Sequence, residues 1–411
     1  MERLYERCCA LDVHKATVSA CVRVPDRSGK RVELKATFST MTSELLALRD
    51  WLLGLGVTQV AMEATGVYWK PVWYVLEDEF ELILCNAAHV KNVPGRKTDA
   101  SDAQWLCQLL EHGLLRGSFV PPKPIRELRD LSRYRKTLIK ERQREANRLH
   151  KVLEDAGIKL GCVASDILGV SGRAMIDALI AGQGEPEELA ELARGRLRAK
   201  LPALREALNG RFAAHHRRLA SHILDHLDHL DQTIATISEE IGEQIAPFAR
   251  QVELLETITG VGQRAAECIL AELGPDMSRF PSHRHAARWA RISPGNNESG
   301  GRQRAGSTGK ANPWLREILI ECARAASRSR DTYLKAQYLR LRRRRGDQKA
   351  IVAVAHSILI SAYYILARNE PYHDLGFDHY DRLERHDQHV RRLTRQLEAL
   401  GHRVTLEPLA A

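Results

Sequence analysis

The sequence lacks the long apolar runs of a membrane protein. Nowhere do about 18 uncharged, strictly apolar residues follow one another, which is the length that a transmembrane helix needs. The nearest approach, KAIVAVAHSILISAYYILAR at 349–368, is interrupted by histidine, serine and tyrosine, and these favour a core helix. The first residues, MERLYERCCALDVHK, hold acids and no apolar stretch, so they do not predict a secretory signal. We expect a cytoplasmic, nucleoid-associated protein with no membrane partner.

Cysteine occurs without the spacing of a zinc site or a disulfide framework. Eight cysteines are scattered along the chain, singly or as the pair Cys8–Cys9, and no CxxC is present. This pattern is typical of reduced intracellular thiols.

Positive charge, in contrast, is in excess and clustered. The chain has 62 lysines and arginines against 52 acidic residues. Residues 121–150 hold ten of these cations and four acids, and residues 322–346 hold nine cations and one acid. Clusters of this kind favour a polyanion partner, with nucleic acid the leading class, although a solvated basic face is the simpler alternative.

The first third of the chain predicts an α/β domain. The stretch CCALDVHKATVSACVRV has the alternation of a strand that enters a hairpin, VPDRSGK predicts its turn, and RVELKATFST a third strand. Helices and strands then alternate. The sequence predicts a helix in TSELLALRDWLLGLG, a buried strand in VTQVAMEATGVYW, a helix through KPVWYVLEDE, a strand in FELILCNA and a helix at 99–113. A mixed sheet covered by helices accounts for this order.

Four acidic residues fall at functionally telling places in that domain. Asp12 and Glu63 come near the carboxyl ends of two predicted strands, and Asp99 and Asp102 are three apart at a helix start. Converging carboxylates repel unless cations hold them together, and oxygen-rich sites suit Mg²⁺ or Mn²⁺. Taken singly, each acid has a structural explanation as a cap, turn or solvated residue; as an ordered set they predict a metal site. The cations Arg96 and Lys97 would face phosphates.

The segments ALDVHK, AMEATGVYW and KTDASDAQWL resemble the Asp, Glu, Asp-x-x-Asp signature of the DEDD transposases of bacterial insertion sequences, the IS110 family. The resemblance covers about residues 8–370. It implies a RuvC-like, RNase H-like fold for the first domain and divalent metal on Asp12, Glu63, Asp99 and Asp102.

The middle of the chain predicts long helices. One should run from Ile125 to about Gly157 and another from about 213 to 245. The second carries a seam with near-heptad spacing, suited to dimerisation or to packing against the first. Its members are Leu219, Ile223, Leu227, Leu230, Ile234, Ile237 and Ile241. Three histidines beside the seam, His222, His226 and His229, have the spacing of one helix face, and we interpret them as a surface stripe rather than metal ligands.

The last third begins with LLETITGVGQRAAECILAELG, which predicts a helix-hairpin-helix element. In such an element the backbone at Gly260 and Gly262 would approach a DNA phosphate; tight helix packing would demand the same glycines. The basic run at 342–345 (Arg342, Arg343, Arg344 and Arg345) is a second expected phosphate contact, with Tyr333 and Tyr338 interleaved.

A glycine-rich loop, ISPGNNESGGRQRAGSTGKANP, follows. By the family resemblance its ESG serine, Ser299, is a nucleophile that forms a covalent protein–DNA intermediate, and Ser307 is the local rival. Arg302, Arg304 and Lys310 could hold a phosphate. No histidine base is adjacent, so activation would come from the metal or the acidic domain.

These observations predict four parts: a RuvC-like DEDD domain at 1–120, a helical coiled-coil region at 121–250, a transposase domain at 251–370 and a helical tail at 371–411. The expected activity is DNA transposition or recombination by metal-dependent strand cleavage and rejoining. We expect a homo-oligomer, a dimer or tetramer, because a serine in one domain must meet a metal site in another. The resemblance also implies a noncoding bridge RNA as a partner besides DNA. The alternatives are a RuvC-like junction resolvase that uses water, a non-catalytic nucleic-acid-binding derivative, and a DDE transposase, which would have a lone third acid.

Overall fold

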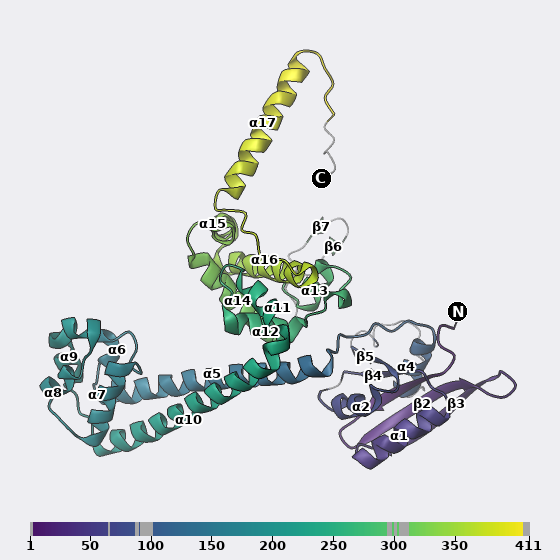
Figure 1. Ribbon diagram of the computed structural model, residues 1–411, viewed down its shortest axis with the longest axis horizontal. Helices are drawn as coiled ribbons and strands as arrows, with labels where there is room; N and C mark the ends of the chain where they lie inside the picture. Colours follow the sequence, from purple (N-terminus) through teal and green to yellow (C-terminus); the bar gives the residue numbers. More distant parts are fainter. Residues whose placement is uncertain are drawn as a thin grey trace. The chain divides into compact units, whose positions relative to one another are not determined.

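The computed structural model describes residues 3–64, 66–86, 90, 102–293, 298–299, 302–303 and 312–405, with the backbone alone at 298–299, 302–303 and 384–387 (Figure 1). The chain divides into two compact units, Met1–Pro121 and Pro122–Ala411. The finer boundaries expected near 250 and 370 stay predictions.

The first unit is built on a mixed five-stranded sheet of order β3-β2-β1-β4-β5. β1, β2 and β3 form an antiparallel meander, while β4 and β5 run parallel to β1. The strands are β1 (Cys8–Val13), β2 (Thr17–Pro25), β3 (Arg31–Ser39), β4 (Gln59–Glu63) and β5 (Glu81–Cys85). The mixed α/β domain expected from the alternating strand patterns is therefore confirmed.

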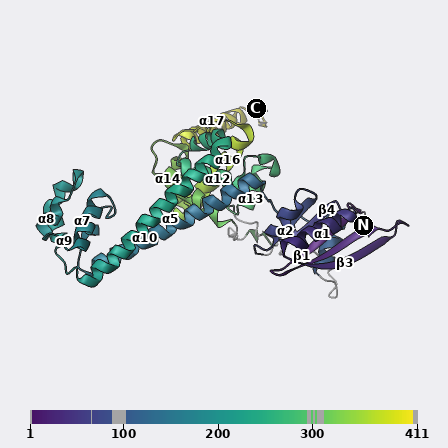
Figure 2. The ribbon, with the colours of Figure 1, turned by 60° about the horizontal axis from the view of Figure 1, so that its bottom comes forward.

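Helices cover both faces of this sheet, as the ribbon shows (Figures 1 and 2). α1 (Thr42–Gly54) and α2 (Trp69–Leu76) pack on the face that carries Leu11 and Met62. α4 (Asp102–Glu111) packs on the opposite face, against Ala10 and Ala61. Because strand side chains alternate between faces, every second residue of β1 and β4 points toward α4.

The second unit begins with a long helical hairpin. α5 (Lys123–Asp155) and α10 (Ala214–Ile245) lie side by side and run antiparallel, since Arg142 pairs with Asp231 and Asp155 with His216 (Figures 1 and 2). Between them the chain forms a small helical cluster that shares a core with the ends of the hairpin. Its elements are α6 (Leu160–Val163), α7 (Val170–Ala181), α8 (Pro186–Glu191), the 3₁₀ segment η1 (Gly195–Lys200) and α9 (Leu201–Leu208).

The predicted seam of α10 is correct except for its first member. From Ile223 to Ile241 its residues are buried, but Leu219 is 50% exposed and Ala220 takes the buried position instead. Neighbouring helix residues are 100° apart, so the sequence alone does not decide which of Leu219 and Ala220 faces the partner helix. Alanine is also too small to stand out in a hydrophobic pattern. α5 is that partner helix.

The rest of the second unit is a helical bundle. Its core helix is α16 (Asp347–Arg368), which is apolar and long enough to cross a membrane by composition, yet packs against α11, α13, α14 and α15. The remaining elements are η2 (Ala246–Phe248), α11 (Ala249–Glu256), α12 (Gln263–Leu273), η3 (Met277–Arg279), α13 (His283–Trp289), α14 (Pro313–Arg328), α15 (Tyr333–Arg345) and α17 (His379–Ala399). The expected helical character of this part of the chain is confirmed.

Candidate acidic site and serine segment

Two of the four predicted acids stand side by side at one end of the sheet. β1 and β4 are parallel and pair Leu11 with Met62, so the next position in the same register sets Asp12 beside Glu63. Glu63 ends β4, and Asp12 is the last residue but one of β1. Both acids therefore lie at the carboxyl edge of the parallel strands, where open α/β sheets bind their ligands.

Both acids also belong to the face that α4 covers. Ala10 and Ala61 pack in the α4 core, and Asp12 and Glu63 each follow two residues later. Cys85 on β5 pairs with Glu63 on β4. Burial, and to a lesser extent the negative charge of Glu63, raises the pKa of Cys85 to about 12. The carboxylate of Glu63 is therefore close to that buried core.

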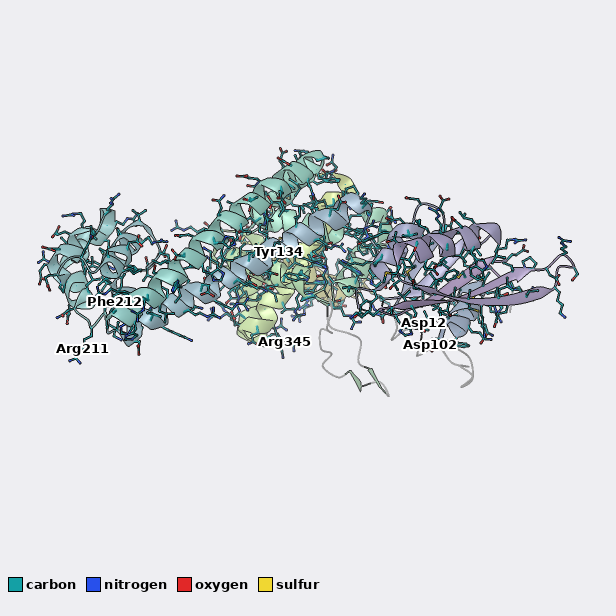
Figure 3. The ribbon with its side chains drawn as sticks, turned by 90° about the horizontal axis from the view of Figure 1, so that it is seen from below. Asp12, Asp102, Tyr134, Arg211, Phe212 and Arg345 are labelled. Atoms are coloured by element: carbon teal, nitrogen blue, oxygen red, sulfur yellow. The ribbon has the colours of Figure 1, made fainter. Side chains whose placement is uncertain are left out.

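The direction of α4 brings a third acid to the same end. Cys107 Sγ lies 4.0 Å from Cys8 Sγ, at the start of β1. Lys35 pairs with Cys21, which pairs with Ala10, two residues beyond Cys8 along β1, and Lys35 donates to Gln104 Oε1 at 3.0 Å. α4 thus runs antiparallel to β1, and its first residue, Asp102, lies toward the end that holds Asp12 (Figure 3).

A histidine without a predicted role contacts this site. His14 Nε2 lies 3.2 Å from Asp12 Oδ2, and its side chain is largely exposed. Both residues lie in the motif ALDVHK, two positions apart, and His14 immediately follows β1. The chain turns at this point, where the N–H of His14 donates to the carbonyl oxygen of Thr17. When protonated, His14 would supply one positive charge to the acidic cluster.

The remaining predicted members of this site, Asp99, Arg96 and Lys97, lie outside the described residues. The structure sets Asp12 beside Glu63 and directs the start of α4, with Asp102, toward the same end of the sheet. Among the described residues these acids are not drawn together at metal-ligand spacing, so a metal site shared by them and Asp99 stays a prediction.

The predicted nucleophile lies in a two-stranded hairpin of the second unit. β6 (Glu298–Ser299) pairs antiparallel with β7 (Arg302–Gln303), and the register sets the backbone of Ser299 opposite Arg302. Two glycines separate these partners in the sequence, as a tight hairpin turn favours. Arg304, Ser307 and Lys310 lie outside the described residues.

The chain after this hairpin is anchored at Asn312 by a helix cap and by a contact with Glu272. Asn312 caps α14, accepting the N–H groups of Trp314 and Leu315, and its amide donates to the carboxylate of Glu272. Glu272 is buried and also accepts two hydrogen bonds from Arg133 on α5, at 2.7 and 2.9 Å. The cap was readable from Asn312–Pro313, whereas Glu272 gave only the pattern of one more helix acid.

The two glycines of the turn before α12 have different roles, one in packing and one open to the predicted phosphate contact. Gly260 has φ +87°, and a Cβ there would stand 2.6 Å from the carbonyl oxygen of Cys322 on α14, so packing alone requires this glycine. Gly262 is the N-cap of α12 and has open space around it, so phosphate contact at this amide end of the helix stays a prediction.

The basic run at 342–345 ends α15, and all four arginines are exposed, as phosphate contact would need. Arg345, the last of them, is labelled in Figure 3. The interleaved tyrosines are not free to stack on bases. Tyr338 is buried and donates to Asp347 at 2.6 Å, and Tyr333 stacks on Tyr380 at 5.6 Å between ring centroids.

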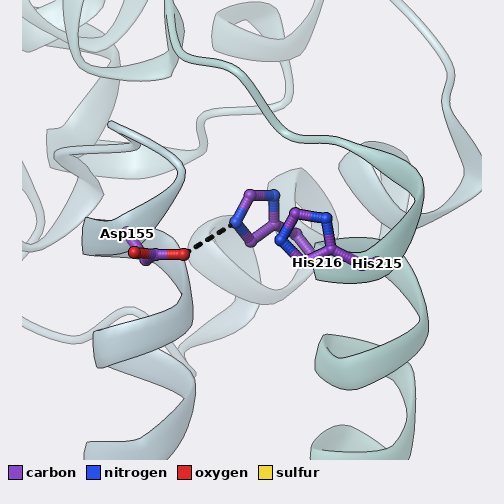
Figure 4. Close-up of side chains that lie close together, drawn as sticks. All are labelled: Asp155, His215 and His216. Carbon is purple, nitrogen blue, oxygen red and sulfur yellow. Dashed lines mark hydrogen bonds and ion pairs between the residues drawn. The ribbon is translucent and has the colours of Figure 1, made fainter.

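A second cluster with metal-ligand chemistry, Asp155, His215 and His216, lies where α5 and α10 meet (Figure 4). His216 Nδ1 accepts the N–H of Ala213 at 3.1 Å, and its Nε2 lies 3.0 Å from Asp155 Oδ2. A neutral ring that accepts at Nδ1 carries its proton on Nε2, so both nitrogens are engaged. We therefore interpret the cluster as a cap of α10. The exposed His222, His226 and His229 belong to no metal cluster within the described residues.

Two stretches of the chain match the models of known families. Residues 9–158 match the DEDD transposase family model named for IS110, and residues 252–339 match the model of the transposase IS116/IS110/IS902 family. A relative described as a probable family 20 transposase, from Pseudomonas aeruginosa, is 28% identical over 334 residues, 79% of this chain and 88% of the relative. A putative transposase y4pF/y4sB from Sinorhizobium fredii is 26% identical over 326 residues, 77% of this chain and 74% of that protein.

Proposed function

Because the chain belongs to the IS116/IS110/IS902 family of transposases, we propose that it cuts and rejoins DNA strands with a metal-bound acidic site and Ser299 as nucleophile. The observation that supports the proposal is the register that sets Asp12 beside Glu63 at the carboxyl edge of the parallel strands, together with the direction of α4, whose first residue, Asp102, lies toward that end. Carboxylates that lie near one another repel unless cations hold them together.

The donor set fits a hard divalent cation. Carboxylate oxygens are the ligands that Mg²⁺ and Mn²⁺ prefer, and in this proposal Asp12, Glu63, Asp102 and, by the family resemblance, Asp99 hold the metal. The bound metal would polarise a phosphodiester and stabilise the charge of attacking and leaving oxygens. The 3-2-1-4-5 order of the sheet supports the RuvC-like, RNase H-like fold that this role implies.

Ser299 is proposed to carry the strand-exchange chemistry. Its Oγ would attack the scissile phosphorus, forming a P–Oγ ester as the bond to one deoxyribose oxygen breaks. The proton that Oγ loses is balanced by the proton that the leaving oxygen takes up. The number of phosphate ester bonds is conserved, so the reverse reaction with another DNA end rejoins strands without an energy source.

The partners follow from charge and family. Transposases act on DNA, and the exposed 342–345 arginines, with the N-cap of α12 at Gly262, are the proposed phosphate contacts. We further propose a bridge RNA and a homo-oligomer, both from the family resemblance. Polyanion affinity alone does not distinguish RNA from DNA.

The test is denaturing electrophoresis of the full chain with labelled DNA carrying the element ends, the flanking RNA and Mg²⁺. We expect a labelled band that contains protein joined to DNA. Ser299→Ala and Asp102→Asn should abolish it, while the matched control Ser307→Ala should retain it. Circular dichroism of each variant checks that the fold is intact.

Other outcomes separate the alternatives. Strand cleavage without a covalent band, and unaffected by Ser299→Ala, would replace the serine mechanism with hydrolysis of the junction-resolvase kind. Loss of the band in Ser307→Ala alone would move the nucleophile to Ser307. Binding of metal and DNA with no cleavage in any condition would indicate a non-catalytic derivative.

A further inference from the structure

The C-terminal helix presents an apolar face that nothing in the described chain covers. α17 is attached near its start, where Tyr380 stacks on Tyr333 and the guanidinium of Arg340 lies 4.5 Å from the Tyr380 ring centroid. Further along α17 (Figure 1), the leucines remain open to solvent. Leu393 and Leu397 are each 44% exposed, and Leu400, which caps the helix, is 74% exposed.

The apolar positions follow the spacing of a coiled coil. Leu383, Val390 and Leu397 are seven residues apart, and Leu393 and Leu400 repeat the same interval offset by three. This assigns the first three to heptad position a and the other two to d, with His386 at the remaining d position in the sequence. A strict 3.5-residue period gives a narrow seam, which a second helix of the same period covers, whereas packing on a globular core favours a wider 3.6-period face.

The polar residues fit a second copy of the same helix. In the 389–396 stretch the seam is flanked at e and g by His389, Thr394 and Gln396, so two copies meet no like-charged pair there. Arg391, Arg392 and Arg395 fall at b, c and f, on the outside of such a pair.

We propose that α17 pairs with α17 of a second copy of this chain as a short parallel coiled coil. The α10 seam, which the sequence offered for dimerisation, is covered by α5 of its own chain, whereas the α17 seam is uncovered by the described residues. α17 lies outside both stretches that match the transposase family models. Its outer arginines would give the pair a basic surface.

Cysteine cross-linking of the full chain tests the pairing directly. In a Cys162→Ser background, which removes the exposed native thiol, Leu393→Cys puts a thiol in the seam and Arg395→Cys puts one outside it. Copper(II) phenanthroline accepts the two electrons released as the disulfide forms, and dissolved oxygen reoxidises the copper and takes up the two protons as hydrogen peroxide. We expect a covalent dimer from Leu393→Cys at least ten times faster than from Arg395→Cys. Equal rates, or no dimer, would overturn the proposal.

Sedimentation supplies a readout that needs no reactive thiol. Leu393→Asp with Leu397→Asp should lower the average mass of the full chain, while the matched outer pair Gln388→Asp with Ala399→Asp should not. A mass that is the same for wild type and both variants, together with no cross-link, would show that α17 does not join two copies of the chain. That result would also overturn the pairing, and it would leave the cleavage mechanism untouched.

Discussion

Replacement of Glu272 by alanine should destabilise the helical unit strongly, because this carboxylate joins three elements. It lies on α12, accepts two hydrogen bonds from Arg133 of α5 and receives the amide of Asn312 at the start of α14. A third cation, Arg129, has its Nε 3.5 Å from the same carboxylate. Glu272→Ala therefore removes the negative charge that these two arginines of one helix share.

The size of the effect follows from what each arginine can do afterwards. Breaking a buried ion pair by removing one partner costs about 3–5 kcal/mol. The Arg133 side chain is 31% exposed and can be hydrated, but that of Arg129 is only 12% exposed. Burial already lowers the pKa of Arg129 to about 10, and the charge of Glu272 opposes that shift. We therefore expect the lower end of the range, about 3 kcal/mol, a factor of roughly one hundred in the unfolding equilibrium.

The assay is urea unfolding followed by far-ultraviolet circular dichroism, which reports mainly the helical unit. The matched control is Glu317→Ala, which also removes an acid paired with α5, to Lys136 and Lys140, but one whose side chain is 36% exposed. Such exposed pairs contribute about 0–1 kcal/mol. If Glu272→Ala costs no more than Glu317→Ala, the buried network does not hold α5, α12 and α14 together.

Three further predictions use other features. Gly260→Ala should lower the free energy of unfolding by about 2 kcal/mol or more, because Gly260 has a positive φ and the backbone of α14 lies beside it. The control Gly262→Ala should lower it by less than about 1 kcal/mol. Equal losses would contradict the packing explanation for Gly260. Iodoacetamide at pH 8 should modify exposed Cys162 within minutes and spare buried Cys322. Burial raises the pKa of Cys322 to about 12, so roughly one Cys322 thiol in ten thousand is ionised at that pH. Mass spectrometry of the folded chain checks this, and rapid modification of Cys322 would show that its thiol is not buried. Glutamine at all of 342–345 should lower the slope of log binding constant against log salt by about 0.9 for each phosphate that is no longer neutralised; an unchanged slope would place DNA elsewhere.

The sequence by itself determined the local structure and the inventory of chemistry. Period-two alternation indicated the three-stranded meander, helical periodicity indicated α5 and α10, and Asn312–Pro313 indicated the start of α14, because each of these signals depends on residues close in the chain. The ordered acids identified the candidate site residues before any fold was known. Leu219 shows the limit: a neighbour one residue away could only be preferred once the partner helix was in place.

Tertiary structure alone decided which of these pieces meet. Strand order and the parallel pairing of β1 with β4 set Asp12 beside Glu63, and only the antiparallel run of α4 carried Asp102 to their end of the sheet. In the tertiary structure, α5 packs on the α10 seam, Glu272 is buried and binds Arg133, and the leucines of α17 are exposed. Such pairings join residues tens to hundreds of positions apart, and their energies come from packing and charge burial, which local sequence patterns do not encode.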